Sequence, residues 1–570
     1  VNLNIIDASA FEDCSKLRKL NLTGCTKLKR IETRAFLCCG NLNDIDFSSC
    51  SELTLIGCDT FAECNSIENV DFSGLKNLAV ILGGAFDYCR SLKSLNFSNC
   101  SRLTVIKKPN SYNGHGSFEN CEKLESVNFT GCTNLLELVG NAFANCKNLK
   151  TVDLSPCKQL QKLDAFSNCS SLKDVNLTGC VSLKEIGWFA FTSCENLTKI
   201  DLSKCSNLET LGGFTDCINL KEVNITGCDK IAIISRVAFQ NCSSLKKLDL
   251  SSCIHLKKVG SGAFENTDAL EDFKGYAELE EIGQGAFINC NSLKKVDLSS
   301  CAELIYAESF VNCQNLQTVN LSGCVKLTNA GFSNCSNLKD VNLTGCISLK
   351  LIGFYSCKSL TEIDLSSCIH LERIESGAFE KCTKLESINL FGCTELTEIG
   401  SDAFNSCASL KKIDLSSCVH LKKIESGAFE KCAKLESINL SSCAELTEIG
   451  RNAFDSCDSL KEIDLSSCIH LEKIEYGAFK KCAKLESINL SGCTELTEIG
   501  NNTFDSCDSL KKIDLSSCKK LKFFGGIKGN SLESVNFAGC VNLVTISSKI
   551  EGDNLKTVDF SSCSKLKEFK

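Results

Sequence analysis

Several features common in proteins of this size are missing from the chain. Its 570 residues include no methionine, one tryptophan and two prolines, and there is no long apolar run. Without such a run, we expect no segment that spans a membrane. The 62 basic and 70 acidic residues are closely interleaved, so no block of like charge provides a footprint for nucleic acid or a membrane surface. Because the chain starts at Val1 and lacks methionine, we expect a processed product or an excerpt of a longer chain.

What the chain does contain is one short unit, repeated about twenty-three times. The unit is clearest at residues 410–434, LKKIDLSSCVHLKKIESGAFEKCAK, and we number it from 1 to 25 with Leu410 as position 1. The shared pattern is L-x-x-I-x-L-[ST]-x-C-x-x-L-x-x-I-G-x-x-A-F-x-x-C-x-x. A period of about 20–29 residues that carries L-x-x-L-x-L is typical of a leucine-rich solenoid, in which stacked coils share one core.

The repeat predicts an α/β solenoid of about 23 coils, each of about 22–25 residues. Positions 1 to 7 should form a strand of a parallel, concave sheet, with positions 1, 4 and 6 in the core and 3, 5 and 7 outside. We expect short helical or 3₁₀ turns on the convex side and a continuous stack of the position-20 phenylalanines. The prediction is a single domain, residues 1–570, with an insertion loop at 107–121, an irregular coil at 270–292 and no recognisable caps.

The 43 cysteines lie almost entirely at positions 9 and 23, as Cys418 and Cys432 do. Like positions of adjacent coils should be about 4.8 Å apart, within disulfide reach, but each cysteine would then have an equal partner above and below. Leu75 and Thr267 replace cysteine at these positions, so neither position requires sulfur. We therefore expect reduced thiols that pack as small apolar groups. No C-x-x-C spacing or cofactor motif occurs, so we predict no metal site and no cofactor.

Position 5 is Asp or Asn in every regular coil, although both are poor strand residues. Alternating the two reduces repulsion between carboxylates that lie about 4.8 Å apart and lets amides donate to them. The row is either a self-satisfying surface ladder or a polar strip that receives glycans, cations or a protein. Phe391 adds an aromatic side chain at position 7. The candidate strip comprises Asp364, Asn389, Phe391, Asp414, Asn439, Asp464, Asn489 and Asp514.

Two further features are candidate sites. The insertion loop carries Tyr112, Asn113 and His115, and it is either a tolerated insertion or a specific contact site. Position 5 also creates N-x-[ST] sequons, which are accessible acceptors if the chain passes through a eukaryotic secretory pathway. The sequons are at Asn21, Asn128, Asn176, Asn224, Asn342, Asn439 and Asn489.

The histidines do not suggest catalysis. His255, His370, His420 and His470 all occupy position 11, and the last three recur every 50 residues, like the rest of the repeat. No Ser/His/Asp arrangement, phosphate loop or metal motif is present, so we do not expect an enzyme.

The half-motif at Ile399–Leu410, IGSDAFNSCASL, and at Ile449–Leu460, IGRNAFDSCDSL, resembles the BspA-like leucine-rich repeats of bacteria and anaerobic protists. The other half, L-S-S-C-x-x-L, is closer in wording to plant disease-resistance repeats. The resemblance covers nearly the whole chain. It implies a cell-surface or secreted protein that takes part in adhesion.

We therefore expect a non-enzymatic, extracellular or cell-surface scaffold that binds a protein or glycan on the concave face or the insertion loop. One alternative is a structural element that self-associates through uncapped ends, because bare end coils expose core and strand edges. A second alternative is a cytoplasmic interaction scaffold, because free thiols are uncommon outside cells.

Overall fold

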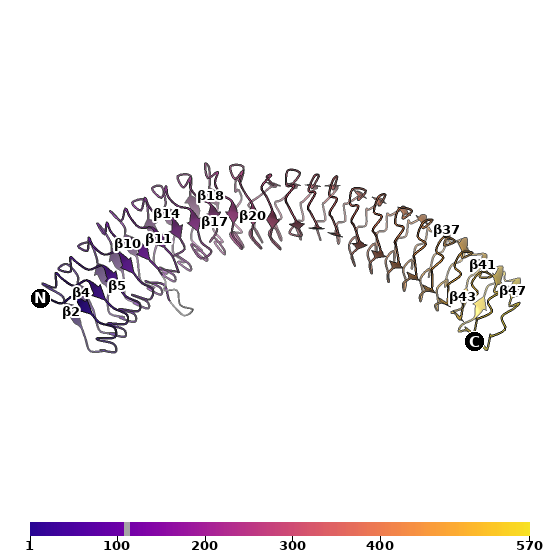
Figure 1. Ribbon diagram of the computed structural model, residues 1–570, viewed down its shortest axis with the longest axis horizontal. Helices are drawn as coiled ribbons and strands as arrows, with labels where there is room; N and C mark the ends of the chain where they lie inside the picture. The colour runs from indigo at the N-terminus through magenta and orange to yellow at the C-terminus, as the bar shows by residue number, and fades with distance from the viewer. Residues whose placement is uncertain (108–114) are drawn as a thin grey trace. The chain divides into compact units, whose positions relative to one another are not determined.

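The computed structural model describes residues 1–107 and 115–570. They form two compact units. Unit 1 is Val1–Glu271 with Glu281–Ser292, and unit 2 is Asp272–Glu280 with Leu293–Lys570. The division falls in the predicted irregular coil. In each unit the chain runs as a stack of coils whose short strands pair in parallel (Figure 1). That residues 1–570 are one domain stays a prediction.

A first row of strands is formed by positions 3 to 5. The middle residue points into the core and its neighbours point outward, because side chains alternate along a strand. The described residues hold 22 such strands, and the coil that starts at Leu245 has only a single bridge, Glu222–Lys247. This agrees with the predicted coil number.

In unit 1 the first-row strands are β2 (Lys19–Asn21), β4 (Asp44–Asp46), β6 (Asn69–Asp71), β8 (Ser94–Asn96), β10 (Ser126–Asn128), β12 (Thr151–Asp153), β14 (Asp174–Asn176), β16 (Lys199–Asp201) and β18 (Glu222–Asn224). In unit 2 they are β21 (Asp272–Lys274), β23 (Lys295–Asp297), β25 (Thr318–Asn320), β27 (Asp340–Asn342), β29 (Glu362–Asp364), β31 (Ser387–Asn389), β33 (Lys412–Asp414), β35 (Ser437–Asn439), β37 (Glu462–Asp464), β39 (Ser487–Asn489), β41 (Lys512–Asp514), β44 (Ser534–Asn536) and β47 (Thr557–Asp559).

A second row forms where the chain returns, around positions 14 and 15. In unit 1 this row is one continuous sheet, β1 (Ile5–Ile6), β3 (Arg30–Ile31), β5 (Leu55–Ile56), β7 (Val80–Ile81), β9 (Val105–Ile106), β11 (Glu137–Leu138), β13 (Lys162–Leu163), β15 (Glu185–Ile186), β17 (Thr210–Leu211), β19 (Ile233–Ile234), β20 (Lys258–Val259) and β22 (Glu281–Ile282). In unit 2 it comprises β24 (Tyr306–Ala307), β26 (Asn329–Gly331), β28 (Leu351–Gly353), β30 (Arg373–Ile374), β32 (Glu398–Ile399), β34 (Lys423–Ile424), β36 (Glu448–Ile449), β38 (Lys473–Ile474), β40 (Glu498–Ile499), β42 (Phe523–Phe524), β45 (Thr545–Ile546) and β48 (Glu568–Phe569). A separate pair, β43 (Ile527–Lys528) and β46 (Ile550–Glu551), lies in the last coils.

The core is a set of stacked rows of identical side chains. The predicted phenylalanine stack is confirmed: the rings of Phe379, Phe404 and Phe429 are nearly parallel, with successive centroids 5.1 Å apart. Unit 1 has a second aromatic stack at position 6, which the sequence analysis missed. Phe72 and Phe97 stack at 5.1 Å there, and Phe72 meets Phe86 of the first stack edge-on at 5.9 Å.

All 43 cysteines are free, and all but Cys14, Cys38, Cys58 and Cys563 are buried. The structure therefore agrees with packed thiols. It also gives the thiol a polar role, because the Sγ of Cys432 donates to the carbonyl oxygen of Phe404 in the preceding coil at 3.1 Å. That carbonyl already accepts the N–H of Cys407, so the thiol occupies its second acceptor site.

The predicted helical or 3₁₀ turns are wrong. No helix is present in residues 1–107 and 115–570, and positions 16 to 23 form a series of tight turns. Asp402 and Ser406 both adopt left-handed backbone angles, with φ of 56° and 63°. Between these two residues, the backbone N–H groups donate alternately to the next coil and within their own coil. Phe404 donates to Ala428 of the next coil, and Asn405 donates back to Asp402 in its own coil. A helix needs successive bonds within one segment, and this alternation excludes them.

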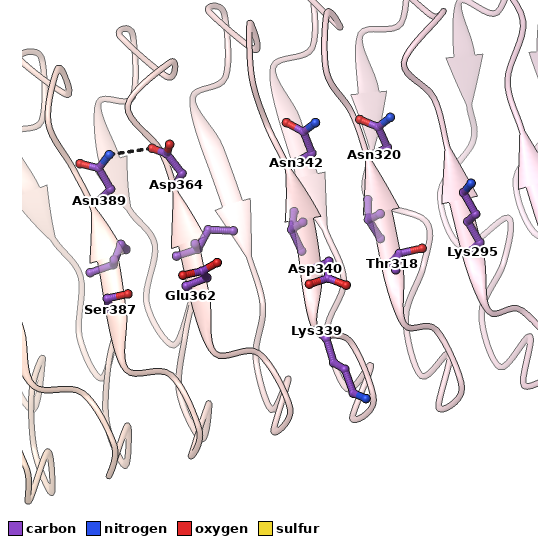
Figure 2. A pocket seen from close by; sticks show the side chains of 14 residues that line it. Lys295, Thr318, Asn320, Lys339, Asp340, Asn342, Glu362, Asp364, Ser387 and Asn389 are labelled. Atoms are coloured by element: carbon purple, nitrogen blue, oxygen red, sulfur yellow. Dashed lines mark hydrogen bonds between the residues drawn. The ribbon is translucent and has the colours of Figure 1, made fainter.

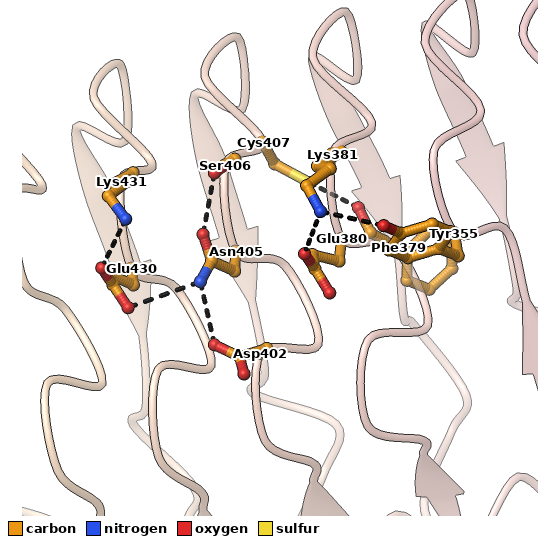
Figure 3. A network of polar contacts seen from close by, with 10 residues as sticks. All are labelled: Tyr355, Phe379, Glu380, Lys381, Asp402, Asn405, Ser406, Cys407, Glu430 and Lys431. Carbon is orange, nitrogen blue, oxygen red and sulfur yellow. Dashed lines mark hydrogen bonds and ion pairs between the residues drawn. The ribbon is translucent and has the colours of Figure 1, made fainter. Parts of the chain in front are cut away.

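Polar side chains cross-link these turns (Figure 3). The amide of Asn405 donates to Asp402 at 2.8 Å in its own turn. One coil earlier, the ammonium of Lys381 lies 2.8 Å from both Glu380 and the hydroxyl of Tyr355. The turn segment is thus held by bonds along and between coils.

Candidate functional site

The Asp and Asn residues at position 5 close a turn directly after the first-row strands, except for β21, which ends at Lys274. The Oδ1 of Asp414 accepts the backbone N–H of Ser416 at 3.0 Å. The same bond, to the residue two places further on, forms at all 22 of these Asp and Asn residues, with N···O distances of 2.7–3.2 Å. Asp and Asn have the short side chain that this Asx turn requires, which explains why position 5 uses them.

The turn also favours the ionised form of the Asp414 and Asp464 carboxylates. The hydroxyl and backbone N–H of Ser416 bond to Asp414 and hold the pKa of its carboxyl below its ordinary range. Ser466 does the same to the pKa of Asp464. These groups are therefore fully ionised at neutral pH.

Asparagines at position 5 also join one coil to the one before it. The Nδ2 of Asn389 donates to Oδ1 of Asp364 at 2.9 Å, and Asn439 donates to Asp414 at the same distance. We call such a pair a dyad. The amide points to the preceding coil in each case. Further dyads are Asn96–Asp71, Asn224–Asp201, Asn320–Asp297 and Asn536–Asp514.

The dyads match the way in which the first-row sheet is divided. Every coil with Asn at position 5 after the first coil, from Asn96 to Asn536, pairs with the preceding coil at all three strand residues. Each break within a unit falls in front of an Asp coil, at Asp71, Asp153, Asp201, Asp364 and Asp464. An Asn can bring a donor to the coil before it, and an Asp brings none, although the coils of Asp46, Asp297 and Asp559 also pair with the preceding coil at all three strand residues. The first-row face is therefore built in blocks.

A groove crosses one of these breaks in unit 2. Its volume is about 760 Å³, and strands β23, β25, β27, β29 and β31 line it. Figure 2 shows the Asp364–Asn389 dyad at one end, with Asn342 and Asn320 in the same row. The lower row mixes charges, with Lys295 opposite in sign to Asp340 and Glu362. The groove thus offers fixed donors, acceptors and both signs of charge.

The predicted strip is only partly assembled into this site. Asp364 and Asn389 line the groove, whereas Asp414, Asn439, Asp464, Asn489 and Asp514 lie on coils beyond it. The side chain of Phe391 is 75% exposed, and its backbone N–H donates to Oδ1 of Asn389 at 3.0 Å. The structure therefore places an exposed aromatic ring on the coil that ends the groove.

The family becomes clear once this repeat geometry is set beside known sequences. The description "BspA type Leucine rich repeat region (6 copies)" matches residues 1–108, 96–213, 212–339, 304–432 and 347–469. The chain belongs to the BspA-type leucine-rich repeat family. No curated protein matches it significantly.

Solved structures similar to this BspA-type chain are themselves leucine-rich repeat proteins. A protein from Bacteroides ovatus is 26% identical, with 61% of this chain and 87% of that chain covered and a TM-score of 0.47. The functional domain of InlJ from Listeria monocytogenes, described as including a cysteine ladder, is 14% identical, with 82% and 75% covered and a TM-score of 0.22. A leucine-rich cell surface protein from Faecalibacterium prausnitzii is 17% identical, with 72% and 83% covered and a TM-score of 0.20.

The candidate loop is described only at its end. Tyr112 and Asn113 lie outside the described residues. The Nδ1 of His115 lies 3.5 Å from a carboxylate oxygen of Asp87 and 3.7 Å from Glu119. Asp87 is buried, and this burial raises its pKa to about 6, although Asn120 donates to it at 3.0 Å. The loop therefore ends beside two acidic side chains, Asp87 and Glu119, of the BspA-type turn segment.

Sequence reasoning missed two sets of residues. The motif N-x-[ST] also occurs at Asn96 and Asn320, both at position 5, so the sequon series is longer than predicted. The charged residues at position 3 that line the groove were not predicted, because the sequence of a single coil does not show which coils form a groove together. Among the described residues no cluster of three or more His, Cys, Asp or Glu could hold a metal ion. The same residues contain no helix that is long and apolar enough to cross a membrane.

Proposed function

We propose that this BspA-type repeat protein is a non-enzymatic recognition scaffold, secreted or at the cell surface, that binds an oligosaccharide in the first-row groove of unit 2. The observation that carries the proposal is the groove itself, with the Asp364–Asn389 dyad at its end and the exposed Phe391 ring on the same coil. The extracellular location is inferred from the family, and the proposed binding does not require a membrane anchor.

The dyad suits sugar hydroxyls, because each hydroxyl both donates and accepts a hydrogen bond. Asp364 offers a carboxylate, and Asn389 offers the second N–H of its amide. Both side chains are already held by Asx turns at 2.9 Å and 3.0 Å, so binding does not have to order them. The groove volume of about 760 Å³ lies within the range of ligand sites. A ring such as Phe391 offers a flat apolar face to the C–H side of a sugar.

The test is binding to an array of glycans, with variants matched by geometry. Asp364→Ala/Asn389→Ala removes the groove dyad, and Asp414→Ala/Asn439→Ala removes an identical dyad outside the groove. Both lose the same turns and the same 2.9 Å bond, so any difference in binding reports the groove. We expect about tenfold or greater loss for the first pair only, because two hydrogen bonds to ligand disappear.

Phe391→Ser offers a second, cleaner variant. It restores the residue type that most coils have at position 7, so the fold should be unchanged. We expect weaker glycan binding with an unchanged unfolding midpoint. Equal losses in the two dyad variants would contradict the proposal.

A protein partner is the second candidate, and the exposure of Phe391 favours it, because exposed aromatics are frequent anchors of protein interfaces. It would be indicated if the glycan array stayed blank while the native chain captured a surface protein that Phe391→Ser no longer captured.

A further inference from the structure

One flank of unit 2 carries an exposed apolar row that the groove does not use. It lies at position 10, in the turn between the two strands of each coil. Ile369, Val419 and Ile469 are 42%, 41% and 47% exposed. In the coils between them the same position holds a smaller residue, Thr394, Ala444 or Thr494. Six successive coils therefore alternate large and small.

Unit 1 provides the contrast. Its first coils place polar residues at position 10, namely Thr26, Ser51, Lys76, Ser101 and Thr133. Two later coils of unit 1 carry large residues at this position, because Val181 and Ile254 there are 49% and 52% exposed. The fold thus accepts either kind of residue at position 10, and what distinguishes the six coils of unit 2 is the regular alternation of large and small.

Basic and acidic side chains alternate beside this row. Position 11 reads His370, Glu395, His420, Glu445, His470 and Glu495 in the same six coils. The imidazoles of His370 and His420 lie 3.1 Å and 3.0 Å from the glutamates that follow them. Position 14 alternates too, as Arg373, Glu398, Lys423, Glu448, Lys473 and Glu498. Arg373 and Lys423 pair with Glu398 and Glu448 of the following coils. Bonds within the chain thus account for part of this series, but they do not account for Ile, Val, Thr and Ala at position 10.

We propose that this flank, positions 10, 11 and 14 of the six coils from Leu360 to Ser509, binds the same flank of a second copy of the chain in antiparallel orientation. The twofold axis lies between the coils of Val419 and Ala444. Val419 then faces Ala444, Ile369 faces Thr494, and Ile469 faces Thr394. Each large side chain meets a small one.

The charges fit the same register. With this axis every histidine at position 11 faces a glutamate. At position 14 Arg373 faces Glu498, Lys473 faces Glu398 and Lys423 faces Glu448. A parallel, in-register pair would set each glutamate against its own copy, and an antiparallel register shifted by one coil would likewise set glutamate against glutamate. Like charges in contact cost free energy. Of these three arrangements, only the one that sets large residues against small ones also avoids this repulsion.

The contact is small. Six coils at about 4.8 Å give a length of about 29 Å, and the flank is about 13 Å wide if four residues span it. The face measures roughly 380 Å² per copy, or about 750 Å² in total, which is below the roughly 1,200 Å² of standard specific interfaces, so we expect a weak, concentration-dependent dimer.

Sedimentation velocity over a wide range of concentration tests the proposal with the full chain. We expect reversible dimerisation of the native protein. Val419→Lys/Ile469→Lys should weaken it by about tenfold or more, because each lysine would bury a charge against the partner. The matched control is Ser51→Lys/Ser101→Lys at the same position in unit 1, which should dimerise normally. Thermal unfolding checks that both variants keep the fold.

The register has its own test. Ala444→Val places two large residues opposite each other and should weaken the dimer. Val419→Ala/Ala444→Val exchanges large and small across the axis and should restore it. A chain that stays monomeric at every concentration would overturn the proposal. So would normal dimerisation of Val419→Lys/Ile469→Lys, or failure of the folded exchange variant to recover.

Discussion

The amide nitrogen of Asn439 lies 2.9 Å from Oδ1 of Asp414, and the same oxygen lies 3.0 Å from the backbone nitrogen of Ser416. One carboxylate oxygen therefore closes the turn of its own coil and binds the next coil. The side chain at position 5 therefore has a mainly structural role, and its remaining outward-facing polar atoms are those that a ligand can contact.

The double role of Asp414 can be separated by mutation. Asp414→Ala should lower the free energy of unfolding by about 1–2 kcal/mol, because the Ser416 N–H loses its acceptor and Asn439 loses its partner. Asp414→Asn keeps the acceptor and should cost less than half as much, since Asn128 donates to Asn96 in the same way at 3.1 Å. Denaturant unfolding of both variants measures this. Equal losses would show that charge, not the turn, is what matters.

Hydrogen exchange should reveal the block boundaries. The N–H of Leu415 donates to Asn439 at 3.0 Å, whereas no such bond joins Leu440 to the following coil in the described part of the chain. The Leu440 amide should therefore exchange faster than the Leu415 amide. Asp464→Asn should slow exchange at Leu440, because the new amide can donate to Asn439. Unchanged exchange would mean that the break has another cause.

Thiol labelling should follow burial. In the native protein, alkylation at mildly alkaline pH should be confined to Cys14, Cys38, Cys58 and Cys563. Burial raises the pKa of Cys432 to about 12, so little reactive thiolate forms at such positions. All 43 should react after denaturation without reductant, as counted by mass spectrometry. A large unreactive fraction would indicate disulfides instead.

Stability should depend on pH in two opposite ways. For Asp414 and Asp464 the folded pKa lies below the ordinary value of 3.8. Their contribution is thus complete above that pH and is lost as the pH falls through the folded pKa. Asp87 has a folded pKa of about 6, above its ordinary 3.8, so its contribution is present at low pH and is lost as the pH rises towards 6. Unfolding curves at several pH values should show that Asp87→Asn removes this second slope and raises stability above pH 6.

Glycosylation remains a prediction for the sequons at position 5. Secretion from a eukaryotic host should place sugar on exposed acceptors such as Asn439 and Asn128, as intact mass would show. The dyad should survive, because a glycosylated amide keeps one N–H for Asp414. Ser441→Ala removes the Asn439 sequon and should remove that glycan alone. A secreted chain without sugar would contradict the prediction.

The sequence predicts the stacked coils, the phenylalanine row and the buried thiols, because each follows from one residue type that recurs at one position. It misses what depends on backbone angle. Ala403 and Phe404 look helical by spacing, but the left-handed residues Asp402 and Ser406 on either side break the run. Side-chain length at position 5 was a usable signal for the turn, since only Asp and Asn occur there outside the irregular coil.

The groove could not be predicted for a different reason. It depends on which neighbouring coils pair through their first-row strands and which do not; β27 and β29, for example, are not paired. Pairing is a property of two coils together. A motif within one coil, however often it recurs, does not contain it.

Because the amides of Asn389 and Asn439 reach backward to a carboxylate, the regular stretch has an orientation that a simple stack lacks. Adding or removing one coil in the regular stretch would set Asp beside Asp or Asn beside Asn. Adding or removing two would leave every donor facing its acceptor. Growth by pairs, 50 residues at a time, is therefore the one change of length that this surface accepts without repair, and it would lengthen the scaffold while leaving the groove as it is.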